Sequence, residues 1–158
     1  MRVTSPDFEN NGFIPKCCTG FGEDRSPELL IEDIPKAAVS LAVILDDLDV
    51  PFCRIFTHWI IWNIPPTERI PRGLPGGERI SSPIAAVQGR AWGKHVYRGP
   101  KQPFFIKKAH RYVFSVYALD RVLALSPESD RAELVKGMSG NILAEVKLTG
   151  IYQPEKRR

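Results

Sequence analysis

Prolines and glycines interrupt this sequence so often that long helices have little room to form. The chain contains 14 prolines and 12 glycines, spread along its whole length. Proline lacks the backbone N–H that a helix interior needs, and glycine loses more conformational freedom than other residues when a helix holds it. The spacing therefore argues against a helix bundle or coiled coil and favours short strands joined by turns.

Several short segments have the composition of strands. Those rich in β-branched, aromatic or other apolar residues and bounded by turn residues are 39–45, 60–64 and 112–119. A last segment, 146–151, alternates apolar and polar side chains, and Gly150 interrupts the alternation as a β-bulge does. One helix is predicted where Ser126 can cap the N-terminus and Pro127 suits the first helical position. These elements predict a mainly β protein, an antiparallel β-sandwich with one or two small peripheral helices.

The remaining segments are long connections. Residues 65–83 are dense in proline, glycine and serine, and residues 85–110 form a second long connection. Loops of this length are unusual in a compact domain and are more often functional than idle. We therefore look for functional residues beside them.

The chain is long enough and apolar enough for one folded domain. Its 158 residues are 43% hydrophobic and 25% charged, which is typical of a globular domain. We expect residues 1–153 to form it and residues 154–158 to be a basic tail. The sequence has neither a membrane-spanning apolar run nor an apolar leader, so we expect a cytoplasmic protein. Cys17, Cys18 and Cys53 match neither a disulfide framework nor a zinc motif, and we expect small buried thiols.

Charge is distributed unevenly along the chain. Residues 1–50 hold ten acidic and four basic side chains, whereas residues 90–111 hold seven basic and no acidic ones. Such a basic segment attracts anions, whether phosphates, acidic proteins or nucleic acid. Aromatic residues lie among the bases, as nucleic-acid stacking requires, but no RNA-binding signature accompanies them and the acidic N-terminal third would repel a nucleic-acid backbone. Nucleic acid is the least favoured of these partners.

Polar residues able to do chemistry cluster beside the predicted strands. The acidic run 46–49 is predicted to form a turn after the first strand, and His58 directly precedes the second. His110, Arg111 and Tyr112 open the third, where alternation points His110 and Tyr112 to one side and Arg111 to the other. These residues could also have a purely structural role. The acidic run 46–49 would then be a solvated turn, and His58 a buried histidine whose hydrogen bonds are satisfied within the protein.

The order of these groups resembles the phosphatidylethanolamine-binding protein family, also called the Raf kinase inhibitor-like family, in its bacterial and archaeal branch. Matching motifs cover nearly the whole chain and include Ser26-Pro27-x-Leu29, His58-Trp59-Ile60-Ile61-Trp62-Asn63-Ile64-Pro65, Tyr97-x-Gly99-Pro100, His110-Arg111-Tyr112 and Leu148-x-Gly150-x-Tyr152. The resemblance implies a Greek-key β-sandwich with a small pocket that binds phosphate or, in some relatives, a phosphoethanolamine headgroup. Carried over by motif, the pocket residues are Asp47, His58, Gly99, Pro100, Pro103, His110 and Tyr112.

Two departures from the family pattern lie beside this pocket. The acidic run lacks a proline at Leu48, and the segment 101–109 is longer, bulkier and more basic than in many relatives. Phe104 and Phe105 in that segment are predicted to anchor the loop. Gly20 and Lys101 stand where several relatives have cysteines, so no disulfide is expected between those loops.

We expect a binding module and not an enzyme. The partner would be a small anion, a phosphate-bearing headgroup or a protein such as a kinase or protease, with no cofactor and no metal; the family branch also allows a homodimer. The alternative is a hydrolase that uses Asp47 with His58 and His110, but residues 137–140 lack the spacing of a nucleophile elbow. A histidine held between a carboxylate and a phosphate should stay protonated, because both partners favour the charged ring.

Overall fold

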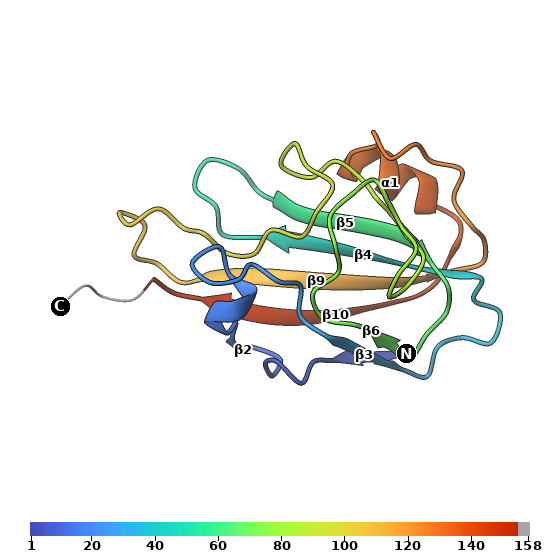
Figure 1. Cartoon of the computed structure of the whole chain (residues 1–158), viewed down its shortest axis with the longest axis horizontal. Helices are drawn as coiled ribbons and strands as arrows, with labels where there is room; N and C mark the ends of the chain where they lie inside the picture. The colour runs from blue at the N-terminus through green and yellow to red at the C-terminus, as the bar shows by residue number, and fades with distance from the viewer. Residues whose placement is uncertain (155–158) are drawn as a thin grey trace.

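The computed structural model describes residues 1–154, so all of the predicted basic tail except its first residue lies outside the described residues. In chain order the elements are β1 (Arg2–Thr4), β2 (Gly12–Phe13), the 3-10 helix η1 (Lys16–Cys18), β3 (Leu29–Glu32), β4 (Ser40–Asp47), β5 (Phe56–Ile64), β6 (Arg69–Ile70), β7 (Arg79–Ile80), β8 (Ala86–Gln88), β9 (His110–Leu119), α1 (Arg131–Met138) and β10 (Ile142–Tyr152) (Figure 1). Within this part of the chain no helix is both long enough and apolar enough to cross a membrane.

The strands form two sheets. The larger has the order β2-β10-β9-β4-β5-β8-β7 and the smaller the order β1-β3-β6. Among the strands of the described residues, every pair is antiparallel except β2 with β10. In the larger sheet β4, β5 and β8 lie side by side in chain order, and β9 returns to the free side of β4, which is a Greek key. The predicted mainly β, Greek-key sandwich is confirmed.

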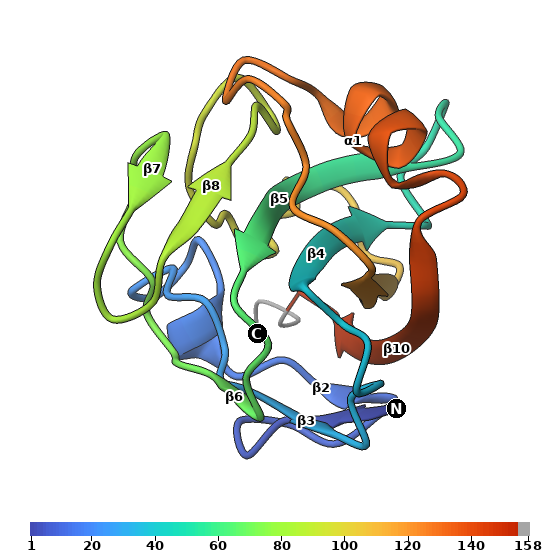
Figure 2. The same cartoon turned by 90° about the vertical axis from the view of Figure 1, so that its right-hand side faces the viewer.

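The core lies between the two sheets. Leu29 of β3, Val43 of β4 and Phe114 of β9 are completely buried in one cluster. Figure 2 shows β3 and β6 on one side of this core, with β4, β5 and β10 curving around the other. The outer face of the larger sheet is covered as well, because Ile44 packs in a second cluster with Leu134 of α1. Burial on both faces explains why β4 is a nearly continuous apolar run.

The predicted helix is present but begins later than expected. Asp130, not Ser126, is its N-cap: the Asp130 carboxylate accepts the Glu133 N–H at 3.0 Å, and the Glu133 carboxylate accepts the Asp130 N–H at 2.9 Å. This capping box satisfies two backbone groups at once. Ser126 instead closes the preceding turn, where its carbonyl accepts the Ser129 N–H.

The prediction of a bulge at Gly150 is wrong. Gly150 pairs regularly with Tyr112, and the register shift lies between Ile142 and Ala144. Close packing explains the glycine at position 150, because a Cβ there would come within 2.4 Å of the Ile14 side chain. The two segments predicted as loops are irregular for most of their length, but they also contain the short strands β6, β7 and β8.

Some apolar side chains lie elsewhere than predicted. Cys18 is fully buried and Cys17 half-buried, but Cys53 is exposed, so the prediction of a buried thiol is wrong for Cys53. Burial, with the neighbouring Cys17 sulfur, raises the pKa of the Cys18 thiol to about 12. Phe104 and Phe105 are 82% and 68% exposed and contact each other edge-on, so their predicted anchoring role is also wrong.

Candidate functional site

Three adjacent strands carry polar residues to one end of the larger sheet. Because β4 is antiparallel to β5 and β9, its last residues meet the first residues of both neighbours, and Asp47 lies opposite Phe56 and Tyr112. This end lies to the left in Figure 1, with the loops that follow β4 and precede β9. Asp47 therefore belongs to β4 and not to a turn, and His58 lies within β5 and not ahead of it, which corrects both predictions.

Asp47 and His110 form the central pair of the site. Asp47 Oδ2 lies 2.8 Å from His110 Nδ1, and each side chain is 3% exposed. The other carboxylate oxygen of Asp47 accepts the Asp49 N–H at 2.9 Å. The carboxylate thereby fixes the orientation of the imidazole and engages its Nδ1, so that Nε2 is the ring nitrogen through which His110 can bind a ligand.

His58 is held by backbone and by aromatic rings. Its Nδ1 lies 2.8 Å from the Arg98 carbonyl oxygen, and the rings of Phe56, Trp92 and Tyr112 contact it edge-on with centroids 5.2 to 5.3 Å away. Burial lowers the pKa of His58, and the Arg98 carbonyl opposes this in part. Before an anion arrives, these surroundings favour the neutral ring.

Tyr112 lies between the two histidines. Its ring centroid is 5.3 Å from that of His58 and 6.5 Å from that of His110. Burial raises the pKa of the Tyr112 hydroxyl above its ordinary value, and the neighbouring charge of Asp47 raises it further. The Tyr112 hydroxyl therefore stays protonated and can donate a hydrogen bond in the site.

Arg111 points away from this group, as alternation predicts. Its Nε and Nη2 donate to Asp49 at 2.8 and 3.0 Å, and its backbone N–H donates to the same carboxylate at 2.9 Å. These bonds lower the pKa of Asp49 to about 2 and fasten the loop after β4 to β9. Asp46 is also outside the site, because it binds Arg131 of α1.

Gly99 and Pro100 are buried in the segment that holds His58. The Gly99 N–H donates to Asp24 at 2.7 Å, and the Pro100 carbonyl accepts the Gly20 N–H at 2.9 Å. A Cβ on Gly99 would lie 2.0 Å from the Cys18 carbonyl oxygen, so only glycine fits there without a backbone shift. That Gly99 and Pro100 form a wall of a pocket stays a prediction from the resemblance.

Pro103 differs from the other predicted pocket residues in being exposed. The buried residue of this loop is its neighbour Gln102, which is 5% exposed. The Gln102 side chain is close enough to Tyr112 to oppose the rise in the pKa of that hydroxyl. Sequence reasoning missed Gln102, since a glutamine between basic and proline residues gives no sign of burial.

An open groove of about 400 Å³ lies beside His58. It is lined by Ile55, Phe56, Thr57, Arg90, Ala91, Trp92, Asp130, Arg131 and Ala132. Phe56 and Trp92 also contact the His58 ring, and the Arg98 guanidinium lies 3.8 Å from the Trp92 ring centroid. The groove and the site thus share a wall of aromatic rings.

Residues that could hold a metal ion lie at another place. Glu78, His95 and Glu128 bring three ligand atoms within 4.8 Å of one another. The Glu128 carboxylate there also pairs with Arg90 at 3.2 Å. This surface cluster shares no residue with the group around Asp47.

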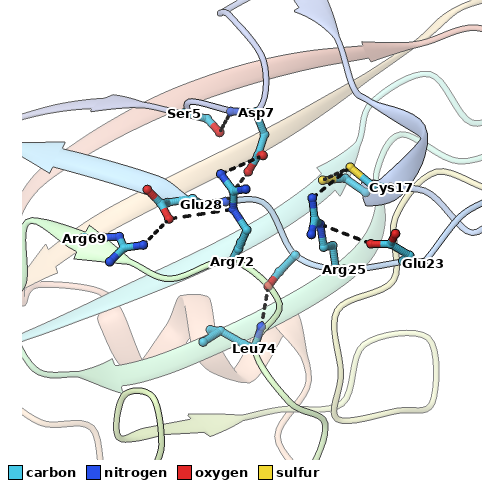
Figure 3. Close-up of polar contacts among 11 residues, drawn as sticks. Ser5, Asp7, Cys17, Glu23, Arg25, Glu28, Arg69, Arg72 and Leu74 are labelled. Atoms are coloured by element: carbon cyan, nitrogen blue, oxygen red, sulfur yellow. Dashed lines mark hydrogen bonds and ion pairs between the residues drawn. The ribbon is translucent and has the colours of Figure 1, made fainter.

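The motif that begins at Ser26 is structural. The Ser26 hydroxyl accepts the Leu74 N–H at 2.9 Å. Glu28, two residues further on, pairs with Arg69 at 2.8 Å and with Arg72 at 4.0 Å, in the cluster that Figure 3 shows. These contacts tie the connection after β5 to the smaller sheet and lie apart from the histidines.

Sequence comparisons find relatives that match nearly the whole chain. A sequence model of the family described as phosphatidylethanolamine-binding protein matches residues 4–153. A UPF0098 protein of Pyrococcus abyssi is 45% identical over 154 residues, covering 97% of this chain and 85% of its own. A UPF0098 protein of Methanothermobacter thermautotrophicus is 39% identical over 155 residues, covering 97% and 99%.

Solved structures show the same fold. The crystal structure of a phosphatidylethanolamine-binding protein homolog from Chlamydia trachomatis matches with a TM-score of 0.86 at 33% identity, covering 98% of this chain and 97% of the other. Escherichia coli YbcL, described as a member of the mammalian family, matches with a TM-score of 0.85 at 26% identity over 98% of each chain. With the family model spanning nearly every described residue, this chain belongs to the phosphatidylethanolamine-binding protein family.

Proposed function

We propose that this protein is a binding module that recognises a small anion, above all a phosphate group, through the residues around Asp47. The observation that carries this proposal is the placement of His58 and His110 on either side of Tyr112, with Asp47 bonded to His110. The phenol supplies an O–H donor, and each imidazole supplies an Nε2–H donor once an anion has favoured its protonation; these are the groups that bind phosphate oxygens. Membership of a family named for a phosphate-bearing lipid supports the same ligand class.

The surrounding charge favours an anion. The basic segment 90–111 ends at this site and contains no acidic residue. Lys101, Lys107 and Lys108 are exposed on the loop that follows Gly99 and Pro100. Positive charge beside a binding site raises the local concentration of anions and speeds their association.

We propose binding and not hydrolysis at this site. A hydrolase needs a nucleophile beside a free base. Both oxygens of Asp47 are engaged, one by His110 and the other by the Asp49 N–H. Tyr112 is a poor nucleophile, because its raised pKa keeps the hydroxyl protonated.

Ligand occupancy is proposed to control a protein partner, such as a kinase or a protease. The loop before β9 supports this, since it exposes Phe104 and Phe105 among basic side chains at the end of the sandwich that holds the site. Aromatic residues are enriched in protein interfaces, and the basic side chains beside them favour a partner with an acidic surface. A homodimer and a cytoplasmic location stay predictions.

The test is calorimetric titration with inorganic phosphate and phosphoethanolamine. Wild type is expected to bind at least one of them saturably, and His110→Ala to lose that binding. His110→Asn keeps a donor for Asp47 and guards against misfolding, and circular dichroism checks the fold of each variant. His95→Ala is the matched control, because it removes a histidine from the separate surface cluster. A wild type that binds neither compound, or a His110→Ala variant that binds as well as wild type, contradicts the proposal.

A further inference from the structure

Three side chains that can bind a metal ion meet at the surface from three separate connections. Glu78 directly precedes β7, His95 lies between β8 and β9, and Glu128 lies in the turn before α1. Their ligand atoms all lie within 4.8 Å of one another. One imidazole nitrogen with two carboxylate oxygens is a donor set that suits zinc and neighbouring transition-metal ions.

The His95 ring is held so that its Nε2 faces the cluster. Its Nδ1 lies 3.0 Å from the Gln88 carbonyl oxygen. Because a carbonyl oxygen can only accept, Nδ1 carries a proton and Nε2 is the nitrogen left to bind a ligand. Histidines that bind metals are supported in the same way, by a hydrogen bond from the other ring nitrogen to a carbonyl or carboxylate oxygen.

The spacing of two ligand atoms fits a tetrahedral ion. His95 Nε2 lies 3.4 Å from Glu128 Oε1. Two ligands of a tetrahedral zinc ion, each about 2.1 Å from the metal, lie about 3.4 Å apart. Glu78 is exposed, so its side chain can turn to supply the third ligand.

Arg90 leaves the required carboxylate oxygen available. Its Nη1 donates to Glu128 Oε2 at 3.2 Å, whereas it is Oε1 that faces His95. Arg90 thereby orients the carboxylate from outside the cluster, as a supporting residue does at a metal site. The two carboxylates outnumber the one guanidinium that pairs with them, which favours a cation.

The backbone beneath the cluster is fastened to the buried residue Gln88. The Gln88 N–H donates to the Glu78 carbonyl oxygen at 2.8 Å, and the Gln88 amide Nε2 lies 3.0 and 3.3 Å from the carbonyl oxygens of Gly77 and His95. The Gly77 N–H also donates to the His95 carbonyl oxygen at 2.8 Å. Ligands that are positioned before an ion arrives bind it more tightly, because less conformational freedom is lost on binding.

We propose that Glu78, His95 and Glu128 bind one divalent transition-metal ion, for which zinc is the best fit. Three protein ligands leave a fourth position for water. The bound ion ties together the connection before β7, the segment after β8 and the turn before α1. The inference does not depend on the proposed anion site, with which this cluster shares no residue.

The test is calorimetric titration with zinc chloride in a buffer without phosphate. Wild type is expected to bind one ion saturably, and Glu78→Gln to bind it more weakly by on the order of tenfold or more, because a carboxylate ligand is lost. Glu9→Gln is the matched control, because Glu9 is an exposed glutamate just before β2, at the opposite edge of the larger sheet from β7. No saturable binding by wild type, or equal weakening in the two variants, overturns the inference.

NMR spectra of the imidazole protons locate the ion. Zinc is expected to shift the His95 signals and to leave those of His58 and His110 in place, and His95→Ala is expected to lose the binding. Shifts at His58 or His110 without a shift at His95 place the ion on other residues and overturn the inference.

Thermal unfolding gives a further readout. Zinc in excess is expected to raise the melting temperature of wild type, because an ion that binds the folded state stabilises it. Magnesium at the same concentration is expected to leave it unchanged, because magnesium prefers oxygen ligands and retains its waters. A rise that magnesium matches, or that His95→Ala shows in full, overturns the inference.

Discussion

Asp47 Oδ2 and His110 Nδ1 lie 2.8 Å apart in the interior, although 63 positions separate the two residues in the chain. The pairing of β4 with β9 brings them together, since it sets Asp47 opposite Tyr112, two residues after His110. The two residues stabilise each other, because removing one leaves the other buried without its hydrogen bond.

We expect Asp47→Ala and His110→Ala each to lower the free energy of unfolding by roughly 3 kcal/mol. The double variant should lose clearly less than the sum of the two, because the second substitution removes a group that the first already left unpaired. Urea denaturation of wild type, both single variants and the double variant measures this coupling. If the two losses of unfolding free energy simply add, the result contradicts a direct interaction between Asp47 and His110.

His58 is expected to titrate below the ordinary histidine pKa of 6.5 in the ligand-free protein, because it is buried. Phosphate should move the titration upwards, since a bound anion favours the charged ring. NMR titration of the imidazole protons, assigned with His58→Gln, measures both values. A midpoint at or above 6.5 without ligand contradicts the burial argument.

The lowered pKa of His58 also makes stability depend on pH. Below 6.5 the unfolded chain protonates this histidine before the folded protein does, so protons favour unfolding in that window. The contribution of His58 is complete above pH 6.5 and is lost as the pH falls through 6.5 towards the folded-state pKa. Denaturation curves at several pH values should show a smaller loss on acidification for His58→Gln than for wild type, and equal losses contradict the prediction.

The apolar pattern of the sequence predicted the central strands correctly, because strands that are buried need apolar side chains. β4 is buried on both faces, and a strand in that position needs an unbroken apolar run. The same reasoning ended the strand too early, at Leu45, and left out Asp46 and Asp47. Their burial depends on Arg131 and His110, which come from distant segments, and local composition carries no sign of those partners.

The candidate site could be predicted only in part. His58, His110 and Tyr112 stand in ordered motifs, and strand alternation correctly separated Arg111 from them. Gln102 was missed, because its burial depends on the path of one loop. The exposure of Phe104 and Phe105 was missed for the opposite reason, since apolar side chains are expected to be buried unless a surface needs them.

The capping box of α1 leads to a prediction about helix stability. Asp130→Ala removes the acceptor for the Glu133 N–H and should lower the free energy of unfolding by about 1 kcal/mol. Ser126→Ala is the control, because Ser126 lies in the turn before the helix and its hydroxyl accepts only a long, exposed bond of 3.2 Å from Glu128. Equal losses for the two variants contradict the observed helix start.

The three thiols should react with iodoacetamide in an order set by exposure and ionisation. Cys53 is exposed, whereas Cys18 is fully buried and its pKa is raised to about 12. A thiol alkylates through its thiolate, so Cys53 should be modified first and Cys18 only after unfolding.

Peptide mass mapping after timed alkylation of the folded protein measures this order. Cys53→Ser should remove the fastest reaction and leave the melting temperature unchanged, because an exposed loop thiol contributes nothing to the core. The matched substitution Cys18→Ser introduces a hydroxyl into a completely buried position and should lower the melting temperature. Rapid alkylation of Cys18 in the folded protein contradicts the packing of η1 against the core, and with it the close approach of Gly99 to the Cys18 carbonyl oxygen.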